Sequence, residues 1–145
     1  MRWNPEVAAG NPAHVTIVYH DEAPDRSELE RRLAEVCRTQ PAFDLSVGRA
    51  RPFPSPVRGA FFDVVDAGGR VHAIRRSVLQ PPFQARPRFG LHVTLLHPDQ
   101  GERLEAAWPA LSELGAPGTF TVRSIEIVSG SGVGTRTLAT FVLCG

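Results

Sequence analysis

Two stretches of this 145-residue sequence repeat one pattern at positions 78 residues apart. "PAHVTIVYH" (12–20) and "GLHVTLLHP" (90–98) each place His-Val-Thr in an apolar run typical of a β-strand. A helical pattern and then two further strand patterns follow each stretch, so the order strand, helix, strand, strand occurs twice. Phe43 follows His14 by 29 residues, and Phe120 follows His92 by 28. The sequence therefore indicates an internal duplication.

The periodicity of the remaining residues predicts the individual elements. Segment 24–40 carries apolar residues at helical spacing, and Asp25 or Ser27 can cap its start. A Pro109 inside the last helical pattern should start, kink or split that helix. We expect strands at about 13–19, 43–50, 60–66, 90–98, 120–128 and 137–143, and further helices at about 70–79 and 101–115.

The duplication also predicts the fold class. Packing of the two halves about an approximate two-fold axis gives an α+β fold of two lobes, each an antiparallel sheet with helices, and a cleft between the lobes. A chain of this length suits one domain. We expect a single two-lobed domain over residues 1–145, with lobe one at about 12–67, a connecting helix at about 68–80 and lobe two at about 90–144.

The repeated motif supplies the candidate functional residues. Because side chains alternate along a strand, His14 and Thr16 share one face, and His92 and Thr94 repeat that relation. A single histidine at a strand end is more often a hydrogen-bonded structural residue, and threonine is a common strand former. The recurrence of the pair in equivalent places favours a functional interpretation. We expect the cleft to contain two imidazoles and two hydroxyls.

These motifs, His14-Val15-Thr16 and His92-Val93-Thr94, resemble the two His-x-Thr/Ser motifs of the 2H phosphoesterase superfamily. "PAHVTIVY" is similar to the first motif of its 2',5' RNA ligase-like members. The resemblance implies a bilobed α+β fold and metal-independent, cofactor-free activity on 2',3'-cyclic phosphates or 2',5'-phosphodiester linkages, in RNA ends or nucleotides.

The sequence departs from the family pattern before the first motif. Family members usually have a strand there, whereas 13 residues precede His14 and do not have a strand pattern. We therefore expect either another segment to complete the lobe or an exposed strand edge, and the oligomeric state stays open.

The chemistry of the four residues supports the same activity. Cleavage of a phosphodiester requires a base for the attacking hydroxyl or water, an acid for the departing oxygen, and donors to the nonbridging oxygens. Imidazole serves either proton-transfer role near neutral pH, and a threonine hydroxyl donates to phosphate. We predict His14 and His92 as the catalytic acid and base, with Thr16 and Thr94 binding the substrate phosphate. The assignment of base and acid, and hydrolysis against ligation, stay open.

Two other functional classes compete with this interpretation. One is a non-catalytic module that recognises a nucleotide or an RNA end in the same cleft. The other is a metal-dependent hydrolase with His14 and His92 as ligands, which is disfavoured because no Asp, Glu or further His stands at ligand spacing near either motif. We predict no metal site.

The remaining histidines and the tyrosine are weaker candidates. His20 and His97 are predicted at strand ends. His72 and Arg75 fall at helical spacing, which favours a solvated helix face over a secondary phosphate contact. Tyr19 lies on the opposite strand face from His14, which favours core packing over stacking on a base.

Charge, cysteine content and hydropathy set the remaining limits. A net charge of +1 provides no strong basic field for coating duplex nucleic acid, so an RNA terminus or nucleotide has to be recognised locally. Cys37 and Cys144 form neither a zinc motif nor a disulfide framework, which favours a reducing compartment. No apolar run approaches 18 residues, and the first residues lack the apolar segment of a signal peptide. We expect a cytoplasmic protein without a membrane partner.

Overall fold

The computed structural model describes residues 12–130 and 134–145 of the chain, which form an α+β fold. The elements are α2 (Arg26–Thr39), β1 (Phe43–Pro52), β2 (Ala60–Val65), α3 (Arg70–Val78), β3 (His92–Leu96), the 3₁₀ helix η1 (Pro98–Arg103), α4 (Leu104–Ser112), β4 (Gly118–Val122), β5 (Ser124–Ser129) and β6 (Arg136–Val142). The predicted α+β class is confirmed.

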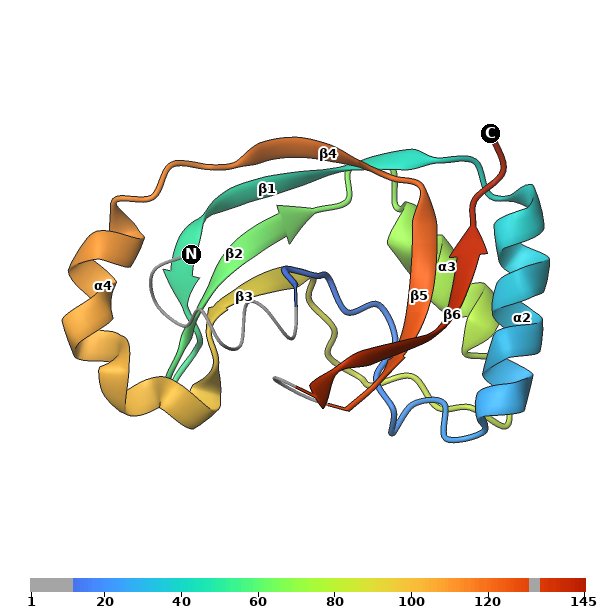
Figure 1. The fold of residues 1–145 in the computed structure, drawn as a ribbon, viewed down its shortest axis with the longest axis horizontal. Helices are drawn as coiled ribbons and strands as arrows, with labels where there is room; N and C mark the ends of the chain where they lie inside the picture. The colour runs from blue at the N-terminus through green and yellow to red at the C-terminus, as the bar shows by residue number, and fades with distance from the viewer. Residues whose placement is uncertain (1–11, 131–133) are drawn as a thin grey trace.

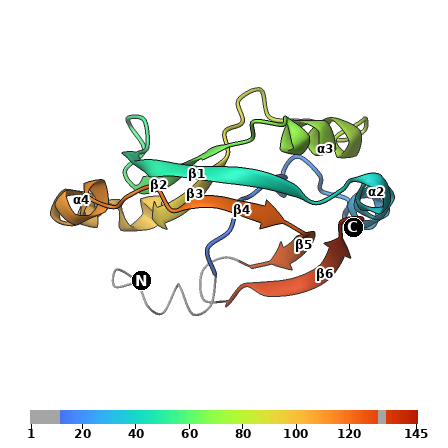
Figure 2. The ribbon, with the colours of Figure 1, turned by 90° about the horizontal axis from the view of Figure 1, so that it is seen from above.

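The strands form two antiparallel sheets. One has four strands in the order β3-β2-β1-β4, and the other contains β5 and β6. Figure 1 shows the larger sheet as a curled layer with α4 at one end and α2 and α3 at the other. In the view of Figure 2, α3 lies above β1 and the β5–β6 pair lies below β4, and side chains of both α3 and β5 pack against the same apolar face of the larger sheet.

The predicted division into two lobes is not confirmed. The four-stranded sheet combines β1 and β2 from the first half of the chain with β3 and β4 from the second. The strand predicted at 120–128 is also interrupted at Arg123, so that β4 pairs with β1 whereas β5 pairs with β6. At this break the backbone N–H of Leu143 donates to the carbonyl of Arg123 at 2.9 Å. The pairs β1–β2 and β5–β6 lie within the predicted lobes, whereas the pairs β1–β4 and β2–β3 join the two halves of the chain.

The strand predicted at 13–19 is wrong. Residues 12–19, all of them described, form neither helix nor strand, and Figure 1 shows this segment as the blue trace between β3 and β5. Val15, Ile17 and Val18 nevertheless pack against the main hydrophobic core. The apolar pattern that predicted a strand thus reflects partial burial against the core. The segment is not hydrogen-bonded to a neighbouring strand as part of a sheet.

Two of the three hydrophobic clusters in the described residues hold the sheet and helices together. The larger joins α2 and α3 to the inner face of the four-stranded sheet, through residues such as Leu33, Leu45 and Ile74. The smaller lies under α4 and contains Ala60, Leu96, Ala107 and Leu111.

Helix ends follow the sequence signals closely. The Asp25 carboxylate caps α2 by accepting from the backbone N–H of Glu28 at 3.0 Å, as predicted. Pro109 lies inside α4, which ends three residues later at Ser112. None of the helices in residues 12–130 and 134–145 is long and apolar enough to cross a membrane.

Candidate active site

A large cavity lies between the N-terminal segment, the inner face of the four-stranded sheet and β5. Its volume is about 870 Å³, and its lining includes His14 and Thr16 of the first motif. From the second motif strand, Val93 and Leu95 line the same cavity. The cavity therefore contains the two polar residues of the first motif and the apolar residues of the second.

The polar residues of the second motif lie on the outer face of β3. In the register between β2 and β3, Val93 is opposite Phe62, and Thr94 is opposite Phe61. Phe62 and Val93 both line the cavity, so alternation along the strand directs His92 and Thr94 to the reverse face. The structure thus does not bring the four predicted residues into the lining of one cavity.

His14, exposed in the irregular segment, and His92, half-buried in β3, nevertheless make the same local hydrogen bond. The Nδ1 atom of His14 is 2.8 Å from the carbonyl oxygen of Pro12, and Nδ1 of His92 is 3.2 Å from the carbonyl oxygen of Gly90. Since a carbonyl oxygen only accepts, Nδ1 must be the donor in both cases. The Nε2 atom of each neutral ring then carries the lone pair, and this is the atom that can exchange a proton with a substrate.

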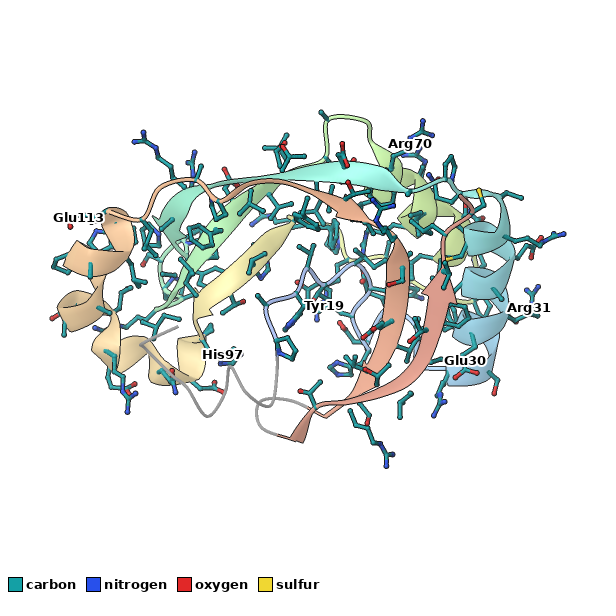
Figure 3. The ribbon with its side chains drawn as sticks, turned by 45° about the horizontal axis from the view of Figure 1, so that its top comes forward. Tyr19, Glu30, Arg31, Arg70, His97 and Glu113 are labelled. Atoms are coloured by element: carbon teal, nitrogen blue, oxygen red, sulfur yellow. The ribbon has the colours of Figure 1, made fainter. Side chains whose placement is uncertain are left out.

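The other histidines differ from this pattern. His97 caps η1, and its Nδ1 atom accepts from the backbone N–H of Asp99 at 3.2 Å, which is the opposite role. Figure 3 shows His97 where β3 leads into η1, away from Tyr19. His20 is exposed in a turn, and His72 makes an edge-on contact with the ring of Phe89 at 5.9 Å between centroids.

A buried ion pair, which the sequence interpretation missed, supports the first motif. Arg75 was predicted on a solvated helix face, but it is only 6% exposed, so that prediction is wrong. Its guanidinium donates to both carboxylate oxygens of Glu22, at 2.6 and 2.9 Å, and to the carbonyl of Ile17 at 2.6 Å. A signal was present in the helix: Val71, Ile74 and Val78 form its buried stripe, and Arg75 follows Val71 by four residues on that same face.

Both carboxylate oxygens of the buried Glu22 accept hydrogen bonds. Its carboxylate also accepts from the backbone N–H groups of Tyr19, at 2.9 Å, and Arg86, at 2.7 Å. Burial alone raises the pKa of Glu22, but the hydrogen bonds and the charge of Arg75 outweigh burial and lower the pKa to about 2. The carboxylate is therefore ionised near neutral pH, and the pair fixes the backbone immediately after Thr16.

Tyr19 is half-buried and lines the cavity, and its ring packs against two neighbouring side chains. The guanidinium of Arg86 lies over its ring, 3.9 Å from the centroid, and the ring of Phe89 meets it edge-on. Figure 3 places Tyr19 on the N-terminal segment near the middle of the molecule. These contacts occupy the ring, so Tyr19 is part of the support for the segment.

The structure describes no cluster of three or more His, Cys, Asp and Glu residues that could hold a metal ion within residues 12–130 and 134–145. The cavity lining includes imidazoles and hydroxyls, which suit proton transfer and hydrogen bonding to a phosphate, together with the charged residues Arg26 and Glu126.

Comparison with known proteins defines the class of protein and then the family. A solved structure described as "Crystal structure of phosphoesterase" matches this fold with a TM-score of 0.63, at 20% sequence identity, over 97% of this chain and 84% of that chain. At that identity the likeness establishes a shared fold. A family model, the 2'-5' RNA ligase superfamily, matches residues 1–134, and the chain belongs to this superfamily. No curated protein sequence gives a significant match. The family supports an enzyme of the phosphoesterase or ligase type.

Proposed function

We propose that the protein is a metal-independent phosphoesterase that acts on 2',3'-cyclic phosphate or 2',5'-phosphodiester linkages in RNA ends or nucleotides. His14, which lines the cavity, and His92, on the outer face of β3, are its proton-transfer groups, so the mechanism requires that both imidazoles reach one phosphate. In hydrolysis of a cyclic phosphate, one imidazole takes a proton from water as the oxygen attacks phosphorus. The other imidazole protonates the ribose oxygen as its bond to phosphorus breaks, which leaves a phosphomonoester.

The observation that carries this proposal is the matched bonding of the two histidines. Both rings donate from Nδ1 to the carbonyl of the residue two positions earlier, so both leave Nε2 for a substrate. A structural histidine such as His97 uses Nδ1 in the opposite sense. Membership of the 2'-5' RNA ligase superfamily supports the same chemistry.

Thr16 and Thr94 bind the nonbridging phosphate oxygens in this proposal. Each follows its histidine by two positions and is half-buried, so its hydroxyl is accessible without being fully solvated. A neutral donor stabilises the charge that grows on these oxygens without fixing the protonation state of the neighbouring imidazole.

Single-turnover cleavage of a 2',3'-cyclic nucleotide and of a 2',5'-linked dinucleotide tests the proposal. His14→Ala and His92→Ala should each lower the rate about 10²- to 10⁴-fold, because each removes one positioned proton-transfer group. The double variant should be hardly slower than either single variant, since the two groups act in one step. Thr16→Val and Thr94→Val should have smaller effects.

The pH dependence and a matched control complete the test. The rate should be bell-shaped in pH, because one imidazole must be neutral while the other is protonated. His72→Ala, which removes an exposed histidine of α3 outside the two motifs, should retain the wild-type rate, and circular dichroism should show all variants folded. A folded His92→Ala protein with the wild-type rate on a substrate that the protein cleaves would refute the two-histidine mechanism.

The same measurements separate the enzyme from a non-catalytic binding module. A module would bind a cyclic nucleotide and gain thermal stability from it, yet leave it intact.

We also propose a cytoplasmic setting, because Cys37 and Cys144 are free thiols and burial raises the pKa of Cys37. A protonated, buried thiol is unreactive and suits a reducing compartment.

A further inference from the structure

An acidic side chain lies directly beside His92 on the outer face of the four-stranded sheet. In the register between β2 and β3, Asp63 is opposite His92. The backbone N–H of Val64 donates to the carbonyl of Leu91 at 3.3 Å, so the next pair along the ladder, Asp63 and His92, is a non-hydrogen-bonded one. The side chains of such a pair stand closest together, with about 4.5 Å between the Cα atoms. The charge of Asp63 is therefore next to the imidazole that the proposed mechanism uses.

The Asp63 carboxylate does not orient this imidazole. The Nδ1 atom of His92 is already bonded to the carbonyl of Gly90, and neither a hydrogen bond nor an ion pair joins the side chains of Asp63 and His92, both of which the structure describes. The carboxylate instead pairs with Arg51, whose Nε atom is 3.2 Å from Oδ2 of Asp63. Asp63 therefore acts on a phosphate held at His92 and Thr94 through its charge.

Arg51 offsets the charge of Asp63 only in part. Arg51 belongs to β1 and is opposite Phe61 of β2, which in turn is opposite Thr94 of β3. The backbone of Asp63 is thus one strand away from His92, and that of Arg51 is two strands away, at about 4.8 Å per strand. The side chains of Arg51 and Asp63 are 65% and 41% exposed, so water screens their attraction. Asp63 is therefore the nearer of the two charged residues to a phosphate at His92.

We propose that Asp63 is a specificity-determining residue that disfavours doubly charged phosphate esters at His92 and so promotes release of the product. This inference rests on the proposed function. In hydrolysis of a 2',3'-cyclic phosphate, the water oxygen bonds to phosphorus, the bond from phosphorus to one ribose oxygen breaks, and that oxygen takes a proton. The cyclic ester carries one negative charge, whereas the new monoester releases a further proton to solvent with a pKa of about 6. The carboxylate of Asp63 therefore repels the product more strongly than the substrate.

Two ligands of similar shape and different charge test this selection. At pH 8 adenosine 2'-phosphate is a dianion and adenosine 2'-sulfate is a monoanion, and neither contains a phosphodiester that the protein could cleave. Calorimetry should show that Asp63→Asn strengthens binding of the phosphate about 10-fold and of the sulfate about 3-fold, because one unit of repulsion across about 6 Å of hydrated surface is lost for the sulfate and two units are lost for the phosphate. Asparagine keeps the size of the side chain, so the fold should be retained.

The matched control is Asp44→Asn, which removes the same charge from the β1–β4 edge of the sheet, where Asp44 accepts from the hydroxyl of Thr121 at 2.6 Å. It should leave both affinities unchanged. In 1 M NaCl, where the Debye length is about 3 Å, the selective gain of Asp63→Asn should disappear. Equal changes for phosphate and sulfate in Asp63→Asn, or no change for either, would overturn the proposal. The same selective gain in Asp44→Asn would overturn it as well, because it would assign the effect to general surface charge.

Product inhibition reports the same selection during turnover. Asp63→Asn should lower the inhibition constant of the monophosphate product by a larger factor than it lowers KM for adenosine 2',3'-cyclic phosphate. The calorimetric test remains valid without turnover. If the wild-type protein cleaves no cyclic nucleotide, the proposed function is refuted, whereas a selective gain for the phosphate in Asp63→Asn still supports the role of Asp63. If neither the wild-type protein nor Asp63→Asn binds either ligand, the inference is refuted whatever the activity.

Discussion

Replacement of Glu22 by glutamine should reveal how strongly the ion pair with Arg75 holds the N-terminal segment. The carboxylate is 1% exposed and accepts hydrogen bonds from Arg75, Tyr19 and Arg86. An amide cannot accept at all these positions, and Arg75 would remain as a buried charge without its counter-ion. We expect Glu22→Gln to lower the free energy of unfolding at pH 7 by about 3–5 kcal/mol.

The pKa of Glu22 provides an independent check on this magnitude. A fall of the pKa from 4.5 unfolded to about 2 folded corresponds to about 3 kcal/mol of stability at neutral pH. Because the folded-state pKa is lowered, this stability is present above pH 4.5 and is lost as the pH falls toward 2. At pH 3, about 2 kcal/mol of it should already be gone. The difference in the free energy of unfolding between wild type and Glu22→Gln should therefore be smaller at pH 3 than at pH 7 by that amount.

Urea unfolding at pH 7, 5 and 3 measures both effects. The matched control is Glu35→Gln, which removes an exposed carboxylate from α2 and should change stability by less than about 0.5 kcal/mol. A stability difference between wild type and Glu22→Gln that is the same at pH 7 and pH 3 would refute the reasoning, because it would mean that Glu22 does not titrate with a lowered pKa.

Three further predictions concern packing, capping and metals. Gly101→Ala should cost about 1–3 kcal/mol in urea unfolding, because its Cβ would lie 2.5 Å from Cβ of Arg58, whereas Gly115→Ala, with no atom within 4 Å, should cost far less. Asp25→Ala should cost about 1 kcal/mol of unfolding free energy through loss of the α2 cap, and an unchanged denaturation midpoint would contradict this. Cleavage of a 2',3'-cyclic nucleotide should survive dialysis against EDTA, because the proposed proton transfers use imidazoles alone; loss of activity restored by a divalent cation would favour a metal-dependent hydrolase.

Local pattern was sufficient to predict most elements of the fold. The helices predicted at 24–40 and 70–79 occur as α2 and α3, and the strands predicted at 43–50 and 60–66 occur as β1 and β2. Each of these segments buries one face, so the spacing of its own apolar residues indicates whether it is a helix or a strand. The cap at Asp25 was predictable for the same reason, because its partner lies three residues away.

The pairing of strands was not predictable from local pattern. The apolar run at 120–128 gives no sign that the chain changes sheets at Arg123, because residues of β4 and β5 have similar hydropathy. The choice depends on β1 and β6, the strands that each piece pairs with. Likewise, β3 pairs with β2 across a stretch of chain that includes α3. The repeated order of elements therefore predicts the type of each element in both halves of the chain. It does not determine which strands share a sheet.

The candidate site shows the same separation between local and distant information. The motif predicted two equivalent histidines, and each makes the same Nδ1 bond to the carbonyl two residues before it. That bond requires only a suitable local backbone, so it forms both in β3 and in the irregular segment 12–19. The ladder that would have made segment 12–19 a strand depends on distant partners, and here Arg75 and Glu22 hold the backbone instead. The motif therefore determines how each imidazole is oriented on its own backbone. The relative position of the two imidazoles depends on the rest of the fold.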